Sequence, residues 1–466
     1  MNATQHRRAF LTSLATLAAG TTLAMPSWQF LSPHKKIRVA LVGTGVRGTS
    51  FWGRRLVEEY SDLLEFVGIS DINPGRLAYG KEYMKVNCPT FTDFDEMMAT
   101  TQPELLIVTT KDSTHHEFIV KGLDAGCDVL TEKPLTTDER KCQAILDAER
   151  RNRGNLIVGF NYRWSPYMTT IKKLLMEQQI GRVNSVDFHW YLNTYHGASY
   201  FRRWHGLRQE GGTLWVHKAT HHFDLLNWWL DSEPEEVHAY GALEHYGSNG
   251  PFRGENCRSC EHKQDCQFHW DITQNQRYMD LYAAHEKYDG YIRDNCLFRH
   301  EVNIYDRMSA QIQYKNQVLA NYSLTTYSPF EGWRIAFNGT DGRIEAWLDI
   351  PWLEGDAISQ DALHAAEMGG EGKATAVKPI ILHKNWQKHE VVPVRYQRGG
   401  HGGGDSRLQD QLFRNPENPD PMGHTAGSRD GAMSILIGIA ARKSIESGHP
   451  VRIAELTDLE PRAKRI

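Results

Sequence analysis

The chain has 466 residues, with 53 Lys and Arg against 57 Asp and Glu, which gives a formal net charge of −4. Apolar residues make up 40% and charged residues 24%, values typical of a folded protein that exclude a disordered or collagen-like chain. The length suits two or three domains with a sizeable core. A near-neutral chain without a basic block argues against nucleic-acid binding, which needs clustered Lys and Arg.

The first 34 residues have the features of an export signal. Arg7 and Arg8 precede a stretch of small and apolar residues that runs to about Ala24 without an acidic residue. This stretch is too short and too weakly apolar to span a membrane. The Arg pair followed by Ala-Phe-Leu resembles a twin-arginine signal. We therefore expect residues 1–34 to be a signal peptide and linker, and the mature protein to be periplasmic, without a membrane span.

A dinucleotide-binding pattern follows. Residues 37–42 are apolar and β-branched, which predicts a short buried strand, and a helical pattern runs on to about Tyr60. Between them lies a G-x-G-x-x-G motif, whose glycines permit a tight turn, close approach of the pyrophosphate and close helix–strand packing. We expect cofactor contacts from Gly43, Gly45, Arg47 and Gly48.

An acidic residue ends the second predicted strand. Asp71 follows a strand over residues 65–70, at a distance from the glycine motif that suits a ribose-binding carboxylate. A carboxylate there accepts hydrogen bonds from the ribose hydroxyls and would repel a 2′-phosphate. This favours NAD over NADP, although Asn73 and Arg76 lie nearby and leave NADP open.

Two further predicted strands, over residues 105–110 and 128–131, also end in polar residues. Strands that alternate with helices at this spacing predict a doubly wound parallel sheet. Ligands bind beyond the carboxyl ends of the strands in such sheets. We therefore place Thr110, His115, Glu132 and Lys133 in the cofactor site.

These motifs continue in order with Asn161-Tyr162-Arg163, Ile180-Gly181-Arg182-Val183 and His221-x-x-Asp224. The series resembles the glucose–fructose oxidoreductase / inositol dehydrogenase (Gfo/Idh/MocA) family. The resemblance implies an α/β protein with an NAD-binding Rossmann domain, residues 35–155, and a C-terminal α/β domain, residues 156–466. The second domain would contain a large open, mostly antiparallel sheet whose exposed face mediates homo-oligomers, and the cleft would lie between the domains.

The resemblance also implies roles for single residues. Lys133 would bridge the reacting hydroxyl and the cofactor ribose, His221 would be the general acid/base, and Asn161 would lie near the nicotinamide. An imidazole with a pKa near neutrality suits the proton transfer, and an ammonium stabilises a developing alkoxide. The residues expected to face the substrate are Tyr162, Arg163, Trp164, Trp204, Trp215, Lys218, Asp224 and His401.

One position departs from the family pattern. Most members carry Asp four residues before the catalytic His, where this chain has His217, followed by Lys218. This changes the charge where the reacting oxygens are expected, and we count His217 among the catalytic residues. His217 and His221 also have the i, i+4 spacing of a helical metal pair. A zinc-protease motif is excluded, because Lys218 stands where that motif needs Glu.

A glycine-rich segment, residues 400–405, resembles a loop that several sugar-processing branches of the family carry near the cleft. Its glycines allow close backbone approach to a ligand, and His401 and Asp405 could bind hydroxyls. A flexible surface loop explains the same segment equally well.

A polar insertion, residues 246–300, contains a cluster of cysteines. Its pattern of Cys257, Cys260, Cys266 and Cys296 matches structural zinc ligation, with His262 and His269 as substitute ligands. Two disulfides would equally suit an oxidising periplasm. The sequence leaves zinc and disulfides open, and either would act as a structural clip.

The remaining patterns predict the rest of the second domain. Two hairpins are expected over residues 308–327 and 333–348, and a final helix over 427–448 is expected to pack at the domain junction. Residues 354–372 are expected to form an excursion of low order.

Aromatic residues and histidines are abundant, with 13 Trp, 19 Tyr, 17 Phe and 22 His. Many of them gather in residues 191–205, ahead of His221, where a sugar ring would stack. Trp228 and Trp229 continue the helix after Asp224 and are expected in the core.

Together these observations predict an NAD-dependent oxidoreductase that acts on a ring hydroxyl of a small carbohydrate. Free NAD is scarce outside the cytoplasm, so we expect a tightly bound cofactor that is recycled in each turnover. The alternative is an NAD-dependent glycoside hydrolase, which works by transient oxidation, elimination, hydration and re-reduction, as some family members do. Ping-pong transfer between two sugars and a sugar-binding protein that keeps NAD structurally are further readings; Lys133 and His221 argue against the last.

Overall fold

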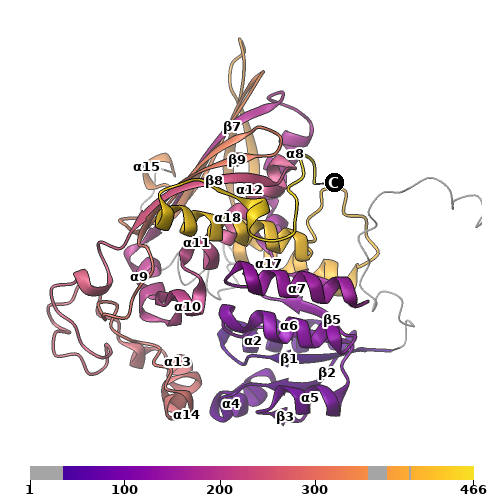
Figure 1. Ribbon diagram of the computed structural model, residues 1–466, viewed down its shortest axis with the longest axis vertical. Helices are drawn as coiled ribbons and strands as arrows, with labels where there is room; N and C mark the ends of the chain where they lie inside the picture. The colour runs from indigo at the N-terminus through magenta and orange to yellow at the C-terminus, as the bar shows by residue number, and fades with distance from the viewer. Residues whose placement is uncertain (1–34, 355–374, 398–399, 466) are drawn as a thin grey trace, which may run out of the picture.

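The computed structural model describes residues 35–354, 375–397 and 400–465 (Figure 1). The predicted signal peptide and linker lie outside the described residues, as does nearly all of the predicted excursion over 354–372. The described chain contains a smaller parallel sheet and a larger mixed sheet, which is the α/β fold class expected from the sequence.

The smaller sheet has six parallel strands in the order β3-β2-β1-β4-β5-β6. Its central strands are buried along their whole length, as strands covered by helices on both faces must be. The predicted Rossmann sheet is thereby confirmed. The strands are β1 (Ile37–Val42), β2 (Leu64–Ser70), β3 (Thr90–Phe91), β4 (Leu105–Val108), β5 (Asp128–Thr131) and β6 (Leu156–Val158). The helices are α2 (Val46–Thr49), the π-helix η2 (Ser50–Arg54), α3 (Arg55–Tyr60), α4 (Pro74–Met84), α5 (Phe94–Thr101), η3 (Asp112–Thr114), α6 (His115–Asp124) and α7 (Glu139–Arg151).

The predicted domain boundary between residues 155 and 156 is wrong. It falls before β6, which pairs in parallel with β5 through Val129 and Leu156. The first domain therefore extends at least to Val158, because this three-residue strand completes its sheet.

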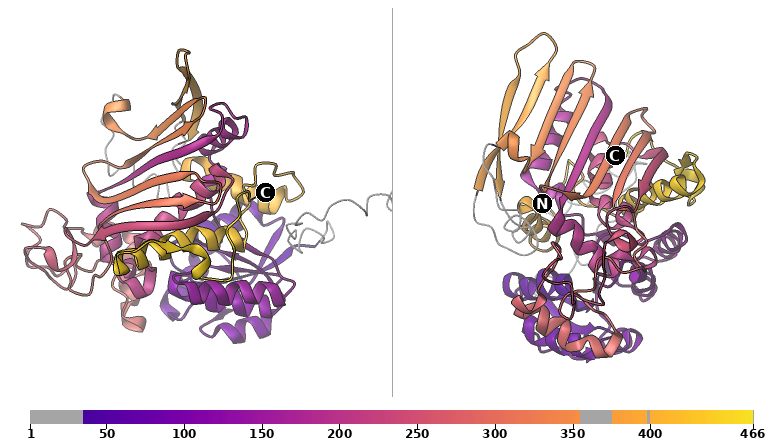
Figure 2. Two further views of the ribbon diagram at one scale, coloured as in Figure 1. Left: turned by 45° about the horizontal axis from the view of Figure 1, so that its top comes forward. Right: turned by 90° about the vertical axis from the view of Figure 1, so that its left-hand side faces the viewer.

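The larger sheet has nine strands in the order β14-β13-β12-β11-β7-β10-β9-β8-β15. Its pairs are antiparallel except for β7 with β10, so the predicted mostly antiparallel sheet is confirmed. Helices cover one face, and the strands turn alternate residues to the open face (Figure 2). The strands are β7 (Val183–Asn193), β8 (Pro234–Ala242), β9 (Arg307–Tyr314), β10 (Leu319–Ser328), β11 (Gly332–Gly339), β12 (Gly342–Leu348), β13 (Thr375–Lys384), β14 (Glu390–Gln397) and β15 (Val451–Arg452).

Both predicted hairpins and the final helix are present. β9 and β10 form the first hairpin, and β11 and β12 form the second. The final helix, α18 (Ser428–Ser447), packs against β8 of the large sheet and also against α7 of the first domain. At Gly438 the helix approaches the chain so closely that a Cβ would lie 2.4 Å from the Trp215 carbonyl oxygen. The helix therefore holds the domain junction together, as expected.

Short helices connect the large sheet to the junction and to the first domain. They are η4 (Tyr162–Trp164), α8 (Pro166–Met176), α9 (Thr194–Arg202), η5 (Trp204–Gly206), α10 (Arg208–Gly211), α11 (Leu214–His217), α12 (Ala219–Leu230), α15 (Pro351–Glu354), α17 (Gly400–Gln409), the π-helix η9 (Asp410–Arg414) and η10 (Ile453–Glu455). Among the helices of the described residues, none is both long and apolar enough to cross a membrane.

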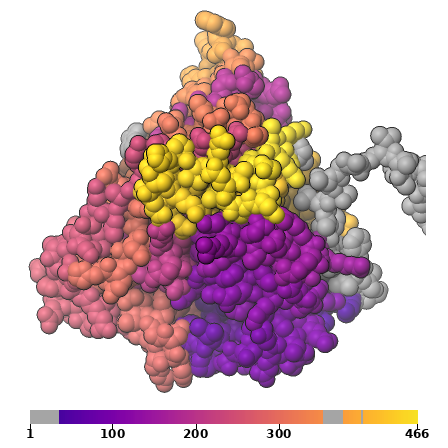
Figure 3. All heavy atoms as spheres, viewed as in Figure 1, coloured from indigo at the N-terminus to yellow at the C-terminus, as the bar shows by residue number. Residues whose placement is uncertain are grey.

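The segment between β8 and β9, residues 243–306, leaves the large sheet and reaches the first domain (Figures 1 and 3). We call it the insertion. Its short helices are η6 (Gly247–Asn249), η7 (Ile272–Gln274), α13 (Gln276–Leu281), η8 (Ala283–His285) and α14 (Glu286–Asp289). Helices α13 and η8 pack against α4 of the Rossmann domain. The insertion therefore bridges the two domains.

The prediction that cysteines clip the insertion is corrected. All seven cysteines are free thiols, and the described residues contain no group of three or more His, Cys, Asp or Glu that could hold a metal ion. The Cys257 sulfur instead accepts a hydrogen bond from Arg202 Nη1 at 2.9 Å. A fully buried carboxylate, Asp294, receives the backbone N–H and the Nε of Arg258, each at 3.0 Å. A buried charge needs such partners, so polar contacts organise the insertion.

Candidate active site

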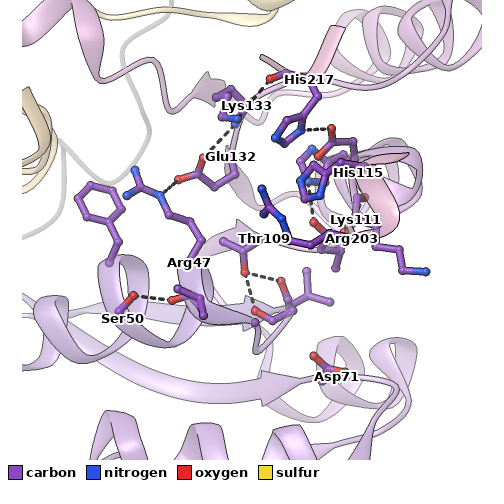
Figure 4. Close-up of a pocket in the computed structure, with 18 of the residues that line it drawn as sticks. Arg47, Ser50, Asp71, Thr109, Lys111, His115, Glu132, Lys133, Arg203 and His217 are labelled. Carbon is purple, nitrogen blue, oxygen red and sulfur yellow. Dashed lines mark hydrogen bonds and ion pairs between the residues drawn. The ribbon is translucent and has the colours of Figure 1, made fainter. Parts of the chain in front are cut away.

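A cavity of about 1130 Å³ lies between the two domains (Figure 4). The carboxyl ends of β1, β4 and β5 form one side, where a doubly wound sheet places its ligands. The insertion, the segment from α9 to α12 and the glycine-rich segment 400–405 form the rest. Residues from both domains therefore meet at one site, as the sequence predicted.

The glycine motif adopts a turn that only glycine permits. Gly43 has φ +96°, and a Cβ there would lie 2.7 Å from the Thr109 carbonyl carbon. At Gly48 a Cβ would lie 2.1 Å from the Gly43 oxygen, so this residue serves helix packing and does not line the cavity. Gly43, Gly45 and Arg47 do line it.

Asp71 lies at the end of β2, inside the cavity wall. Its Oδ2 accepts hydrogen bonds from the N–H and Oγ1 of Thr44 at 2.8 and 2.9 Å. Its Oδ1 lies 3.2 Å from Arg76 Nη2, and the same nitrogen lies 2.5 Å from Asp289 of the insertion. Two carboxylates thus neutralise Arg76, which leaves little positive charge for a 2′-phosphate and favours NAD.

Hydrogen bonds connect the segments that follow β4 and β5. His115 contacts the carbonyl oxygens of Pro134 and Thr110 at 2.8 and 3.2 Å. Glu132 accepts from Arg47 Nε at 2.5 Å and from Trp52 Nε1 at 2.7 Å. All of the cofactor residues predicted here line the cavity: Arg47, Thr110, His115, Glu132 and Lys133.

Lys133 lies beside His217, with its Nζ 3.4 Å from the His217 carbonyl oxygen. Burial lowers the pKa of Lys133 to about 8, although Asp112 and Glu132 nearby favour its charged form. The ammonium is therefore present at neutral pH and is lost in mildly alkaline solution.

His217 has a carboxylate partner that the sequence did not reveal. Its Nδ1 lies 2.6 Å from Oδ2 of Asp112, the first residue of η3 after β4. Burial lowers the pKa of His217 and raises the pKa of Asp112, because each side chain loses the water that would stabilise its charged form. His217 thus occupies the position where the family pattern has Asp, and its ring contacts a carboxylate, Asp112, from the other domain.

The i, i+4 spacing of His217 and His221 does not produce a pair on one helix. His217 ends α11, Lys218 lies outside both helices, and His221 belongs to α12. No metal-binding group that includes them occurs in the described part of the chain.

His221 is buried against the ring of Tyr162, with ring centroids 4.4 Å apart. Burial, reinforced by Lys133 and Lys218, holds its pKa well below the usual value. Its Nδ1 has no hydrogen-bond partner among the described residues. The neutral imidazole at the cavity wall can accept a proton, and its lowered pKa makes it a weak base that releases that proton readily.

The glycine-rich segment is packed into the site. Asp405 Oδ1 accepts a hydrogen bond from Asn161 Nδ2 at 2.6 Å, and both Asp405 oxygens lie 3.1 Å from His401 Nδ1. At Gly404 a Cβ would lie 2.2 Å from the backbone carbonyl oxygen of Asn161. Burial opposes ionisation of Asp405, but His401 and Arg47 outweigh it and hold its pKa below the usual range. Of the two explanations for this segment, the cleft position is confirmed.

Rings form one wall of the cavity. Tyr200, Trp204 and His205 line it, and Trp204 stacks on His205 with centroids 3.6 Å apart. Tyr162, Lys218 and His401 also line the cavity. The aromatic segment ahead of His221 thus supplies a wall of the cavity, as expected.

Four residues predicted to face the substrate lie elsewhere. Arg163 is fully buried, donates to both Asp224 oxygens and contacts Asp430 at 3.2 Å. A buried guanidinium needs such partners, so Arg163 and Asp224 build the junction. Trp164 stacks on His424, with centroids 4.7 Å apart, and Trp215 is fully buried. These placements correct the predictions for Arg163, Trp164, Trp215 and Asp224.

Sequence reasoning missed Asp112, Arg203, Tyr282 and Arg293, all of which line the cavity. Asp112 follows a strand end, a signal that could have found it. Tyr282 and Arg293 belong to the insertion, for which the sequence predicted only a structural clip.

The donors and acceptors of the cavity fit NAD. The glycine turn leaves room for a pyrophosphate, Asp71 offers carboxylate oxygens, and Asn161 Oδ1 is buried without a partner among the described residues. Asn161 lies in the wall that carries Lys133 and His221, where a nicotinamide amide would find this acceptor.

Two family models match the chain. Residues 37–160 match the "Oxidoreductase family, NAD-binding Rossmann fold", and residues 172–453 match the "Oxidoreductase family, C-terminal alpha/beta domain" of the same Gfo/Idh/MocA group.

Curated relatives agree with these matches. The "Putative oxidoreductase YteT" of Bacillus subtilis is 35% identical over 439 residues, covering 91% of this chain and 99% of that protein. The "Inositol 2-dehydrogenase/D-chiro-inositol 3-dehydrogenase" of Lactiplantibacillus plantarum is 23% identical over 204 residues, covering 44% of this chain and 55% of that protein.

Solved structures share the fold. A levoglucosan dehydrogenase in complex with NADH and levoglucosan superposes with a TM-score of 0.61 at 16% identity, covering 90% of this chain and 100% of that chain.

Proposed function

Since the chain belongs to the Gfo/Idh/MocA family of NAD-binding oxidoreductases, we propose that it oxidises or reduces a ring hydroxyl of a small carbohydrate. One observation carries the proposal: Lys133, His221 and the His217–Asp112 pair line a single cavity that also has an aromatic wall.

In the oxidising direction, His221 takes the proton of the reacting hydroxyl, because its imidazole is neutral. The Lys133 ammonium stabilises the negative charge that develops on the same oxygen. NAD, when bound, accepts the hydride that leaves the carbon. In the reducing direction, His221 returns the proton to the alcohol oxygen.

His217 and Asp112 position Lys133 for this chemistry. The His217 carbonyl oxygen contacts Lys133 Nζ, and Asp112 holds the His217 ring in one orientation. Asp112 also favours the charged form of Lys133. We therefore assign positioning roles to Asp112 and, through its carbonyl, to His217.

The carbohydrate substrate is supported by the rings of Tyr162, Tyr200 and Trp204, which offer apolar faces for a sugar ring. The names of relatives point the same way, since they include inositol and levoglucosan dehydrogenases.

A redox-neutral glycoside hydrolase is the second candidate. The insertion contacts the glycine motif through Tyr282 and the ribose side through Asp289, an enclosure that suits a retained cofactor. A cofactor that stays bound must return to its starting oxidation state within each turnover, unless a second substrate reoxidises it.

The test is incubation of the purified protein, with its bound nucleotide, with a panel of sugars and aryl glycosides, followed by mass spectrometry and absorbance. Substrate-dependent NADH formation from a free sugar supports the oxidoreductase. Phenol release without NADH supports the glycosidase. His221→Ala should abolish either reaction, whereas His300→Gln, an exposed site, should not. Full activity of His221→Ala would overturn the assignment.

We also propose that the protein is exported and forms homo-oligomers. Export is supported by the Arg7-Arg8 pair and the apolar stretch after it. Oligomers are supported by exposed apolar side chains on the strands of the open sheet: Tyr240, Leu319, Val377 and Val391. Fractionation of expressing cells and light scattering of the purified protein test the two proposals.

A further inference from the structure

Two of the arginines that line the cavity form no ion pair with a carboxylate of the described residues. The other arginines that line it, namely Arg47, Arg54, Arg55 and Arg76, each form an ion pair with a carboxylate. Arg203 and Arg293 form no ion pair with any described carboxylate. Arg203 donates to the carbonyl oxygen and Oγ of Ser199, and Arg293 contacts the Tyr291 hydroxyl at 3.4 Å.

The missing counter-charge matters because these groups are enclosed. Arg293 is only 8% exposed, and its guanidinium lies about 5 Å from the ring centroids of Tyr278 and Tyr282. Arg203 is half-buried, and Figure 4 shows it inside the cavity between Arg47 and His115. Burial and the nearby Arg293 lower the pKa of Arg203. Arg203 is near enough to Asp112 to favour the charged form of that carboxyl, but it forms no ion pair with it. Two enclosed guanidinium groups that form no ion pair with a described carboxylate are suited to bind an anion with two charges.

The position of this pair identifies the anion. The ring that Arg293 contacts belongs to Tyr282, whose hydroxyl oxygen accepts a hydrogen bond from the Val46 N–H at 3.0 Å. Val46 lies inside the glycine motif, where the backbone meets a dinucleotide pyrophosphate. The Tyr282 hydroxyl keeps its own O–H to donate to a phosphate oxygen.

We propose that Arg203, Arg293 and Tyr282 form an anion-binding clamp for the pyrophosphate of the cofactor, and that the insertion thereby holds the dinucleotide in the enzyme. This inference rests on the NAD-dependent function proposed above.

Hydrogen bonds and an ion pair around the clamp hold its residues in place against the first domain. Arg202, next to Arg203, donates to the Cys257 sulfur and to the Phe268 carbonyl oxygen of the insertion. Asn73 Nδ2 donates to the His285 carbonyl oxygen at 3.0 Å, and Arg76 pairs with Asp289. The clamp residues are thus fixed by contacts from the end of α9, the insertion and the Rossmann domain.

The experiment uses calorimetric titration of the full protein, stripped of nucleotide, with ADP-ribose and with adenosine. The variants are Arg203→Gln and Arg293→Gln, with Arg293→Lys to keep the charge. Arg307→Gln, at an exposed ion pair on β9, is the matched control. We expect each Gln variant to weaken ADP-ribose binding about tenfold or more, because a charged hydrogen bond is lost. Adenosine binding should be unchanged, and Arg293→Lys should lose less than Arg293→Gln.

Three results would overturn the clamp. The first is ADP-ribose affinity that does not respond to either Gln variant. The second is an equal loss for adenosine in variants that keep the wild-type melting temperature. The third is a raised KM for the carbohydrate with unchanged ADP-ribose affinity, which would assign the arginines to an anionic substrate. Failure of the wild-type protein to bind ADP-ribose at all would instead overturn the proposed NAD-dependent function.

Discussion

His217 Nδ1 and Asp112 Oδ2 lie 2.6 Å apart across the junction of the two domains. The carboxylate comes from the first residue of η3, which follows β4, and the imidazole comes from the end of α11. This contact forms only when the domains are assembled, and the His217 carbonyl oxygen lies 3.4 Å from Lys133 Nζ. The carboxylate that the family pattern places four residues before His221 is therefore supplied here from the Rossmann side.

Asp112→Asn should lower kcat by about 10²-fold, because the amide cannot hold the His217 ring and the Lys133 charge as a carboxylate does. NAD affinity should stay unchanged. Steady-state kinetics and a nucleotide titration measure the two effects. Asp95→Asn, at an exposed ion pair, is the matched control. A pH profile identical to wild type would contradict the positioning role, and Asp112→Glu should restore part of kcat.

The pH dependence should show an alkaline limb near pH 8. Lys133 is charged below its pKa of about 8 and neutral above it, so stabilisation of the alkoxide is lost as the pH rises. The pH profile of kcat/KM measures this limb. Lys133→Arg should move the limb to higher pH at reduced activity, since guanidinium stays charged. An unchanged limb in Lys133→Arg would assign it to another group.

Trp204→Ala should raise the KM for the carbohydrate about 2- to 10-fold with little change in NAD affinity, because an aromatic stacking contact is removed. Trp204→Phe should lose less. Trp386→Ala is the matched control, since Trp386 is fully exposed on the hairpin of β13 and β14. Equal KM values in Trp204→Ala and the control would remove Trp204 from the substrate wall.

Asp224→Asn should destabilise the fold by about 3–5 kcal/mol, because it removes the charge that balances the buried Arg163. Denaturant unfolding measures the change. Any variant that remains folded should bind ADP-ribose as the wild type does. If Asp224→Asn weakened substrate binding without a loss of stability, Asp224 would be assigned to substrate binding and not to the junction.

The local patterns of the chain carry much of this fold. Short apolar stretches that alternate with helical segments predict the parallel sheet, and polar turn residues between apolar strands predict both hairpins. The third glycine of the motif follows the same logic, because a Cβ there would meet the Gly43 oxygen only five residues away. Asp71 is predicted from its position at a strand end, although its partner Thr44 lies 27 residues away. The resemblance to a known family adds Lys133, His221 and Asn161, all of which line the cavity.

Residues outside such patterns were harder to place. Arg163 and Asp224 have the residue types of a polar cleft, but each is the other's counter-charge in the core. The cysteines of the insertion have the spacing of metal ligands, yet their sulfurs are free and one accepts from Arg202. The spacing of residues in the sequence shows which polar side chains are present, but it does not show which side chain each one contacts in the folded protein.

The sequence by itself determined the two-domain α/β architecture, the glycine turn and the strand-end residues of the cofactor site, because these depend on interactions within a short stretch of chain. Only the tertiary structure decided that Asp112 contacts His217, that Tyr282 contacts the glycine motif and that Arg293 lies against the Tyr282 ring. These contacts join residues far apart in the chain, and they form because burial of apolar faces at the junction brings the domains and the insertion together.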